Sequence, residues 1–135
     1  MAVGLSPDGR ALYVPLLARP SRVPPLRPTK RDYFVLKPKH SGFFATTLDT
    51  LLETLRIRRV ILTGIAGNIC VLFTANDAYM RDLKIFAPAD CIVSNTAADN
   101  DHALRQIAVV LKGNVTTSTA LRFHGKWRGE KAAAA

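Results

Sequence analysis

The sequence has only two cysteines among 135 residues, Cys70 and Cys91, which is too few for a disulfide framework. We therefore expect a reduced, cytoplasmic setting. No stretch reaches the roughly 18 uncharged apolar residues that cross a bilayer, so a membrane partner is not expected. The three histidines show no metal-ligand spacing, and neither a GxGxxG nor a P-loop pattern occurs. We accordingly expect no metal and no cofactor.

Acidic residues are scarce at both ends of the chain. Eight Lys and Arg against two acids give residues 1–40 a charge of +6, and four against one give residues 121–135 a charge of +3. Residues 41–120 hold seven of each kind and are neutral. A groove that binds nucleic acid would carry its basic side chains on the folded face. We interpret the charge as solvated basic ends, with nucleic-acid binding through those ends as an alternative.

Proline is concentrated near the N-terminus, where six of the eight prolines lie at or before Pro28. Each proline removes a backbone donor and fixes φ, so no helix can cross this segment. We interpret residues 1–30 as an extended, poorly ordered Pro/Arg-rich leader, with room for a short strand only at residues 11–14. The folded domain is then expected at residues 31–120, followed by a basic tail at residues 121–135.

The middle of the chain alternates between strand and helix patterns. Leu48, Leu51, Leu52 and Leu55 make one apolar helical stripe, and residues 60–63 read as a buried parallel strand that ends at Gly64. The expected order is strand 33–36, helix 46–55, strand 60–63, helix 70–81, strand 84–87, helix 103–111 and strand 115–117. This order predicts an α/β fold with a mainly parallel sheet and helices on both faces. Function should collect at the carboxyl ends of the strands, in loops 37–44 and 64–70.

Cys70 is the strongest candidate for chemistry, because it lies six residues after the end of a buried strand. If Asn68 caps the following helix, Cys70 is in the first turn, where N–H groups and the helix dipole favour a thiolate. The same N–H groups can hold an oxyanion. Burial as a small hydrophobic residue is the equally open alternative.

Lys37 ends the preceding strand at the same edge of the sheet, close to Lys39 and His40. A partly desolvated lysine can stabilise a thiolate or pass a proton, whereas an isolated lysine is more often a solvated turn residue. Phe43 and Phe44 either line a pocket or pack in the core. Cys91 has no positioned base and is interpreted as structural.

The segment Lys37-Pro38-Lys39-His40-Ser41-Gly42-Phe43-Phe44, then a Leu-rich helix, then Ile61-Leu62-Thr63-Gly64-Ile65-Ala66-Gly67-Asn68-Ile69-Cys70 resembles the isochorismatase-like cysteine hydrolases. The following Thr74-Ala75-Asn76-Asp77-Ala78 also resembles that family's helix after the nucleophile. The resemblance covers about residues 31–120. It implies a Rossmann-like, three-layer α/β fold and the hydrolysis of a C–N bond, usually in an amide.

The resemblance also assigns roles at the site. Members of the family use an Asp–Lys–Cys triad, in which Cys70 matches the nucleophile and Lys37 the lysine. The Ala66 and Cys70 N–H groups match the oxyanion-hole donors, and the Ile65–Ala66 bond matches a non-proline cis peptide. Lys39 matches a basic residue that is commonly arginine, and Lys39, Phe43 and Asn68 are expected around the substrate. Gly67 stands where the family often has threonine.

The family's aspartate has no counterpart, because no apolar run followed by Asp occurs before Tyr33. Asp8 lies in a turn pattern and Asp32 precedes its strand. We therefore expect a fold truncated at its N-terminal side, in which the strands at 33–36 and 60–63 pair directly or leave an open edge that recruits another chain. The implied protein is a homo-oligomeric cysteine hydrolase acting on a small amide. A non-catalytic family member that works only by association is the alternative.

Overall fold

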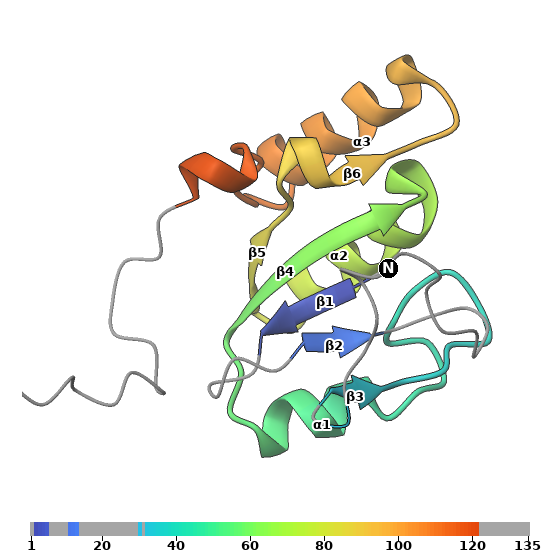
Figure 1. The fold of residues 1–135 in the computed structure, drawn as a ribbon, viewed down its shortest axis with the longest axis vertical. Helices are drawn as coiled ribbons and strands as arrows, with labels where there is room; N and C mark the ends of the chain where they lie inside the picture. The colour runs from blue at the N-terminus through green and yellow to red at the C-terminus, as the bar shows by residue number, and fades with distance from the viewer. Residues whose placement is uncertain (1, 6–10, 14–29, 31, 122–135) are drawn as a thin grey trace, which may run out of the picture.

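The computed structural model of the chain describes residues 2–5, 11–13, 30 and 32–121 (Figure 1). Its strands are β1 (Ala2–Leu5), β2 (Ala11–Tyr13), β3 (Tyr33–Phe34), β4 (Arg59–Ile65), β5 (Lys84–Phe86) and β6 (Ile92–Val93). Its α-helices are α1 (Leu48–Thr54), α2 (Leu72–Tyr79) and α3 (Ala97–Val109). From β3 onward the order is β3, α1, β4, α2, β5, β6 and α3, which confirms the predicted α/β class.

One mixed sheet forms the centre of the molecule, with its strands in the order β3-β2-β1-β4-β5 and with β6 also paired to β4. The pairs β2–β3, β4–β5 and β4–β6 are parallel. Strand β1 runs antiparallel to both β2 and β4. Strand β5 pairs with the first half of β4 and β6 with its last two residues, so β6 lies beside the carboxyl end of β4.

Strands β1 and β2 lie between β3 and β4, which corrects our expectation for this part of the sheet. Neither direct pairing of β3 with β4 nor an open edge between them is seen, because the antiparallel pair β1–β2 bonds to β4 on one side and to β3 on the other. On the β1 side of β4, Leu62 and Thr63 are therefore paired within the sheet. The short strand expected at residues 11–14 is β2, and residues 14–29 of the expected leader lie outside the described residues.

The core forms where the helices cover the sheet. Val60 and Leu62 of β4 are fully buried, as the continuous apolar run predicted. Helix α1 buries Leu48 and Leu52, with Leu51 and Leu55 partly buried beside them, so its Leu stripe faces the core. Burying each such side chain contributes about 1.5–3 kcal/mol.

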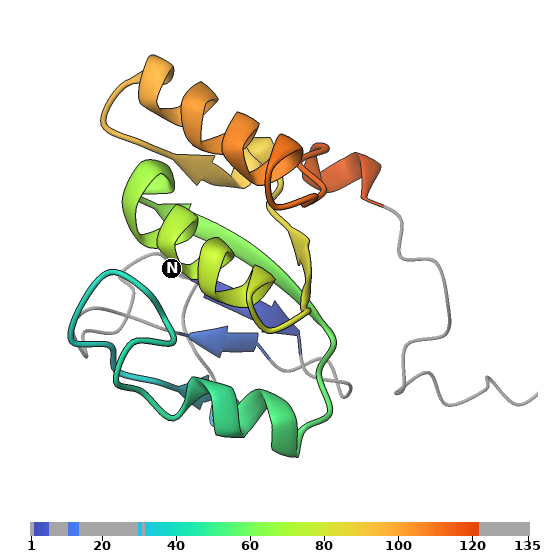
Figure 2. The same cartoon turned by 180° about the vertical axis from the view of Figure 1, so that it is seen from behind.

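All three α-helices lie in front of the sheet in Figure 2, and α2 packs against α3. Along the chain, β3, β4 and β5 follow one another in the same direction across the sheet. Because such crossovers are right-handed, the helices that connect these strands lie on the same face of the sheet. The second helical layer of the expected three-layer arrangement has no helix among the described residues.

None of the helices described has the length and apolar character needed to cross a bilayer.

Two boundaries differ from the sequence-based expectations. Helix α3 begins at Ala97 rather than near Ala103, because the Thr96 Oγ1 atom accepts the Asp99 N–H at 3.1 Å and caps the helix. The strand expected at residues 115–117 is reduced to a single bridge between Phe86 and Asn114. A 3₁₀ turn, Ser118–Ala120, follows it instead.

The 3₁₀ turn at Ser118–Ala120 is tied to the turn Ala89–Cys91 by one carboxylate. Asp90 accepts the Ser118 hydroxyl at Oδ2 and the Ser118 N–H at Oδ1, each at 2.7 Å. These two hydrogen bonds, the side-chain one first, hold the pKa of Asp90 below its ordinary value of 3.8. A depressed carboxyl pKa stabilises the fold above the unfolded-state pKa, and that stability is lost as pH falls through the folded-state pKa.

We therefore expect Asp90→Ala to destabilise the protein modestly at pH 7, because both hydrogen bonds are lost. The part of the difference that depends on the Asp90 charge should shrink as pH falls below 3.8 and be lost once the carboxyl group is protonated in both states. Urea unfolding followed by circular dichroism across this range measures it. A difference that stays constant with pH would show that the Asp90 charge is not involved.

Candidate active site

Lys37 and Cys70 meet at the carboxyl edge of the sheet, where loops after β3 and β4 come together. The Lys37 side chain is 3% exposed, and its Nζ atom donates to the Cys70 Sγ atom at 3.4 Å and to the Lys39 carbonyl at 3.1 Å. A buried ammonium group needs such acceptors, because burial without partners is costly. The predicted lysine–cysteine pair is therefore present, 33 residues apart in sequence.

Cys70 lies in a π-helical turn, Gly67–Val71, which leads directly into α2. The turn begins after Ala66, which has extended φ and ψ angles of −93° and 138°, and the Ile65–Ala66 peptide bond is cis. The prediction that Asn68 caps the helix is wrong, because Asn68 already lies inside the turn. Its backbone N–H donates to the Ser94 Oγ atom at 3.0 Å instead.

Helix α2 holds loop 37–44 in place through side chains that sequence reasoning did not single out. The Gly42 N–H donates to the Thr74 Oγ1 atom at 2.9 Å, and the Thr74 hydroxyl donates to the Cys70 carbonyl at 2.7 Å. The Ser41 hydroxyl donates to the Asp77 carboxylate, one turn further along α2. In the sequence, these contacts correspond to the Thr-x-x-Asp spacing from Thr74 to Asp77.

The aromatic residues of the loop divide between core and surface. Phe43 is buried in the core, with the Arg81 guanidinium 4.5 Å from its ring centre, so packing is the role that its burial supports rather than the expected contact with substrate. Phe44 is exposed. Lys39 and His40 are also exposed, and the His40 ring lies 5.4 Å from the Phe73 ring. Phe73, 51% exposed and three residues after Cys70, is a residue that the sequence analysis missed.

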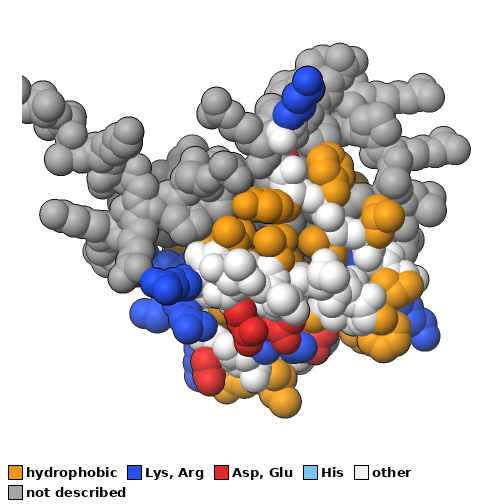
Figure 3. All heavy atoms as spheres, turned by 90° about the horizontal axis from the view of Figure 1, so that it is seen from below, with side chains coloured by type: hydrophobic (Ala, Val, Ile, Leu, Met, Phe, Trp, Pro, Cys, Tyr) orange, Lys and Arg blue, Asp and Glu red, His pale blue; other side chains and the backbone are white. Residues whose placement is uncertain are grey.

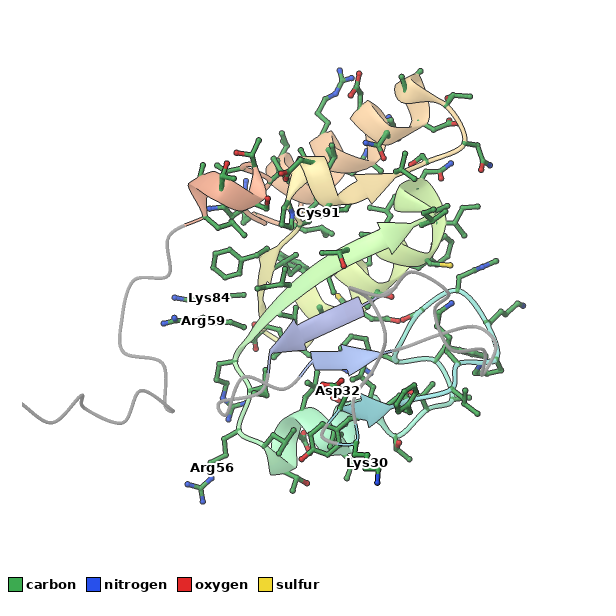
Figure 4. All side chains as sticks on the ribbon, in the orientation of Figure 1. Lys30, Asp32, Arg56, Arg59, Lys84 and Cys91 are labelled. Carbon is green, nitrogen blue, oxygen red and sulfur yellow. The ribbon has the colours of Figure 1, made fainter. Side chains whose placement is uncertain are left out.

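Among the described residues, no carboxylate forms an ion pair with Lys37, and none bonds to the Cys70 sulfur. Asp32 precedes β3, so it lies at the opposite end of that strand from Lys37 (Figure 4). Asp8 lies outside the described residues. The same described residues contain no group of three His, Cys, Asp or Glu side chains that could hold a metal ion. Cys91 lies near β6, and its sulfur is 3.9 Å from the Asp90 carboxylate.

The nucleic-acid alternative depends on the basic ends of the chain, and most of their residues lie outside the described part. Arg59 and Lys84 are register partners at the starts of β4 and β5, and their side chains lie next to each other (Figure 4). On the face shown in Figure 3, acidic and basic side chains lie next to each other, and no continuous basic surface forms there. A binding groove for nucleic acid needs clustered positive charge on one face.

Fold and site together define a Rossmann-like α/β protein with a buried lysine–cysteine pair at the carboxyl edge of its sheet. The family model described as the isochorismatase domain matches residues 20–120. The chain belongs to the isochorismatase family, as the motifs at 37–44 and 61–70 predicted.

Curated relatives agree with this assignment. The chain is 56% identical over 92 residues to the uncharacterized isochorismatase family protein YaaI of Bacillus subtilis, covering 68% of this chain and 51% of the relative. It is 43% identical over 83 residues to the ureidoacrylate amidohydrolase RutB of Methylorubrum extorquens, covering 61% of this chain and 34% of that protein. The chain thus spans about half, or less, of the length of the relatives it matches.

Solved structures are similar over a comparable part of the chain. The nicotinamidase SaPncA from Staphylococcus aureus is 32% identical, with a TM-score of 0.64 and coverage of 67% of this chain and 57% of its own. N-carbamoylsarcosine amidase from Thermoplasma acidophilum is 26% identical, with a TM-score of 0.68 and coverage of 84% and 74%. The named enzymes among these relatives are amidases and amidohydrolases.

The Lys37–Cys70 contact predicts a directed change in thiol reactivity. In a Cys91→Ala background, where Cys70 is the only thiol, Lys37→Met should slow alkylation by iodoacetamide at neutral pH by about tenfold, the effect of roughly 1.4 kcal/mol of thiolate stabilisation. Methionine keeps the buried aliphatic volume and removes the charge. The rate is measured by intact-protein mass spectrometry.

Lys84→Met is the matched control, because it removes the same charge from an exposed position at the other edge of the sheet. Its alkylation rate should equal that of the Cys91→Ala background. Equal rates in Lys37→Met and Lys84→Met would contradict an electrostatic role for Lys37.

Proposed function

We propose that this chain is a cysteine-dependent hydrolase that cleaves the C–N bond of a small amide through a thioester intermediate. The observation that carries the proposal is the 3.4 Å contact between the Lys37 Nζ and Cys70 Sγ atoms at the carboxyl edge of the sheet. An ammonium group beside sulfur favours the thiolate, which is the nucleophilic form. The amidase and amidohydrolase relatives support an amide as substrate.

In the first half of the reaction, the Cys70 sulfur attacks the amide carbonyl carbon and forms a C–S bond. The oxyanion that develops accepts hydrogen bonds from the Ala66 and Cys70 N–H groups. Lys37 is the titratable group in contact with the sulfur, so we assign to it the proton that the leaving nitrogen needs. The C–N bond then breaks, which releases the amine and leaves the acyl group on sulfur.

In the second half, water attacks the thioester carbonyl, and its proton goes to the neutral Lys37 amine. The C–S bond breaks, the carboxylic acid leaves, and the ammonium–thiolate pair is restored. The net reaction is amide plus water giving acid plus amine, with no oxidant or cofactor needed. Lys39, Asn68 and the exposed Phe73 ring are the residues that we place around the substrate.

A second candidate is a family member that binds without turnover. The observation that favours it is that no carboxylate pairs with Lys37 among the described residues, whereas the resemblance implies an Asp–Lys–Cys triad. Removing one member of a coupled triad typically costs several orders of magnitude in rate. The hydrolase proposal therefore predicts slow turnover rather than none.

Ammonia release from a panel of primary amides and ureido acids, including nicotinamide and N-carbamoyl amino acids, separates the two candidates. The hydrolase proposal expects slow release that Cys70→Ala abolishes and Cys91→Ala leaves unchanged, because only Cys70 contacts Lys37. Release that persists in Cys70→Ala would show a contaminating activity. No release from any amide would favour the binding-only candidate.

We also propose that the chain self-associates, although the open sheet edge from which association was expected is not seen among the described residues. Two large apolar side chains in the segment after β3 support this: Leu36 is 57% exposed and Phe44 is 55% exposed. Exposed apolar patches commonly mark interfaces between proteins.

Leu36→Lys should therefore shift the sedimentation coefficient toward that of the monomer at micromolar concentration, because it places a charge in the apolar contact. Exposed Met80, at the end of α2, offers the matched control Met80→Lys, which should leave the sedimentation coefficient unchanged. A wild-type chain that is monomeric under these conditions would contradict the proposal.

A further inference from the structure

A chain of hydrogen bonds runs from α3 to the turn that carries Cys70. The Asn68 N–H donates to the Ser94 Oγ atom at 3.0 Å, and the Ser94 hydroxyl in turn donates to the Asn100 Oδ1 atom at 3.0 Å. The Asn100 Nδ2 group donates to the Ile92 carbonyl at 3.3 Å. Ser94 follows β6, which lies beside the end of β4 (Figure 1), and Asn100 lies in the first turn of α3.

The Ser94 hydroxyl is both an acceptor and a donor in this chain, since it accepts one hydrogen bond and donates another. The single hydroxyl proton of Ser94 is donated to Asn100, so the lone pairs of the Ser94 oxygen are left to accept the Asn68 N–H. Asn100 is itself fixed by the Ile92 carbonyl, so the Oδ1 atom that receives the proton has a defined direction. This relay of hydrogen bonds, from Asn68 through Ser94 and Asn100 to Ile92, therefore fixes the direction of the Asn68 N–H as well as giving it an acceptor.

Gly67 shows how closely the relay lies against the turn. A Cβ atom at Gly67 would meet the Ser94 Oγ atom at 2.7 Å, the Asn100 Oδ1 atom at 2.8 Å and the Ile92 Cγ2 atom at 2.7 Å. Real side chains do not approach so closely, so only glycine fits while the relay is in place. The relay and the close fit at Gly67 together hold the main chain of the turn.

Asn68 lies between Ala66 and Cys70, whose N–H groups are the proposed oxyanion donors. Rotation of the Asn68 peptide would turn the neighbouring peptide planes with it. We propose that Ser94, oriented by Asn100, is a positioning residue for the oxyanion hole. This inference rests on the proposed function, because it assigns Ser94 a role in the acylation of Cys70.

Two reagents separate this role from general structural support. Iodoacetamide alkylates a thiolate at a tetrahedral carbon, and no oxyanion forms there. p-Nitrophenyl acetate acylates the thiolate through a tetrahedral oxyanion, so its rate depends on the donors. A change that misplaces the donors slows the ester reaction alone, whereas a change that unfolds the turn or disturbs Lys37 alters both.

The experiment is run in the Cys91→Ala background, where Cys70 is the only thiol. Ser94→Ala should lower the rate of Cys70 acylation by p-nitrophenyl acetate about tenfold, the effect of one lost hydrogen bond, and leave the iodoacetamide rate within twofold. Thr54→Ala, which removes an exposed hydroxyl on α1, should leave both rates unchanged.

Asn100→Ala provides a second variant that keeps the Ser94 hydroxyl but removes the group that orients it. Asn100→Ala should lower the rate of acylation by p-nitrophenyl acetate about threefold and leave the iodoacetamide rate unchanged. This variant replaces Ser94→Ala in the test if Ser94→Ala does not fold. An equal loss in both reactions, or acylation at the rate of the background protein, would overturn the role of Ser94. Absence of any acylation at Cys70 in the background protein would overturn the proposed function itself, and the role of Ser94 with it.

Discussion

The contact between the Lys37 ammonium group and the Cys70 sulfur is the interaction on which the rest of the site depends. Lys37 is only 3% exposed, and its Nζ atom has the two acceptors that a buried polar group needs, the Cys70 sulfur and the Lys39 carbonyl. Loop 37–44 must therefore stay docked on α2, and the Thr74 and Asp77 side chains bond to it there. The turn that carries the sulfur is held by the Asn68 N–H, which donates to the Ser94 hydroxyl. The site is thus assembled from the carboxyl ends of three strands, β3, β4 and β6.

Features that depend on local pattern could be predicted from the sequence. The Leu stripe of α1 and the buried run in β4 follow from apolar periodicity. The helix buries one face, which spaces its apolar residues at helical intervals, and the strand is at least partly buried on both faces, which makes its apolar run continuous. The place of the site also follows, because carboxyl ends of parallel strands meet at one edge of the sheet. Lys37 and Cys70 were found in this way, and two separated motifs together identified the family.

Features that depend on tertiary contact could not be predicted in the same way. The strands β1 and β2 lie in a proline-rich segment with little periodicity, and their place between β3 and β4 is set by pairing with distant residues. Asn68 is a residue type that favours helix caps, yet the cap position of the turn is Ala66, two residues earlier. Ser94 and Asn100 are ordinary polar residues in sequence, and their importance appears only where β6 returns beside β4. The start of α3 at Ala97 is the exception, since the Thr-x-x-Asp pattern of its cap at Thr96 is visible in the sequence.

The account rests on a single claim, that the buried ammonium group makes Cys70 the acyl acceptor of this fold. The most direct test is peptide mapping after a short exposure of the unsubstituted chain and of Lys37→Met to an activated ester. The account predicts an acyl group on the peptide that contains Cys70 in the unsubstituted chain, and strongly reduced labelling of that peptide in Lys37→Met. Labelling that falls on Cys91 or on exposed lysines, or that is equal in the two proteins, would contradict it.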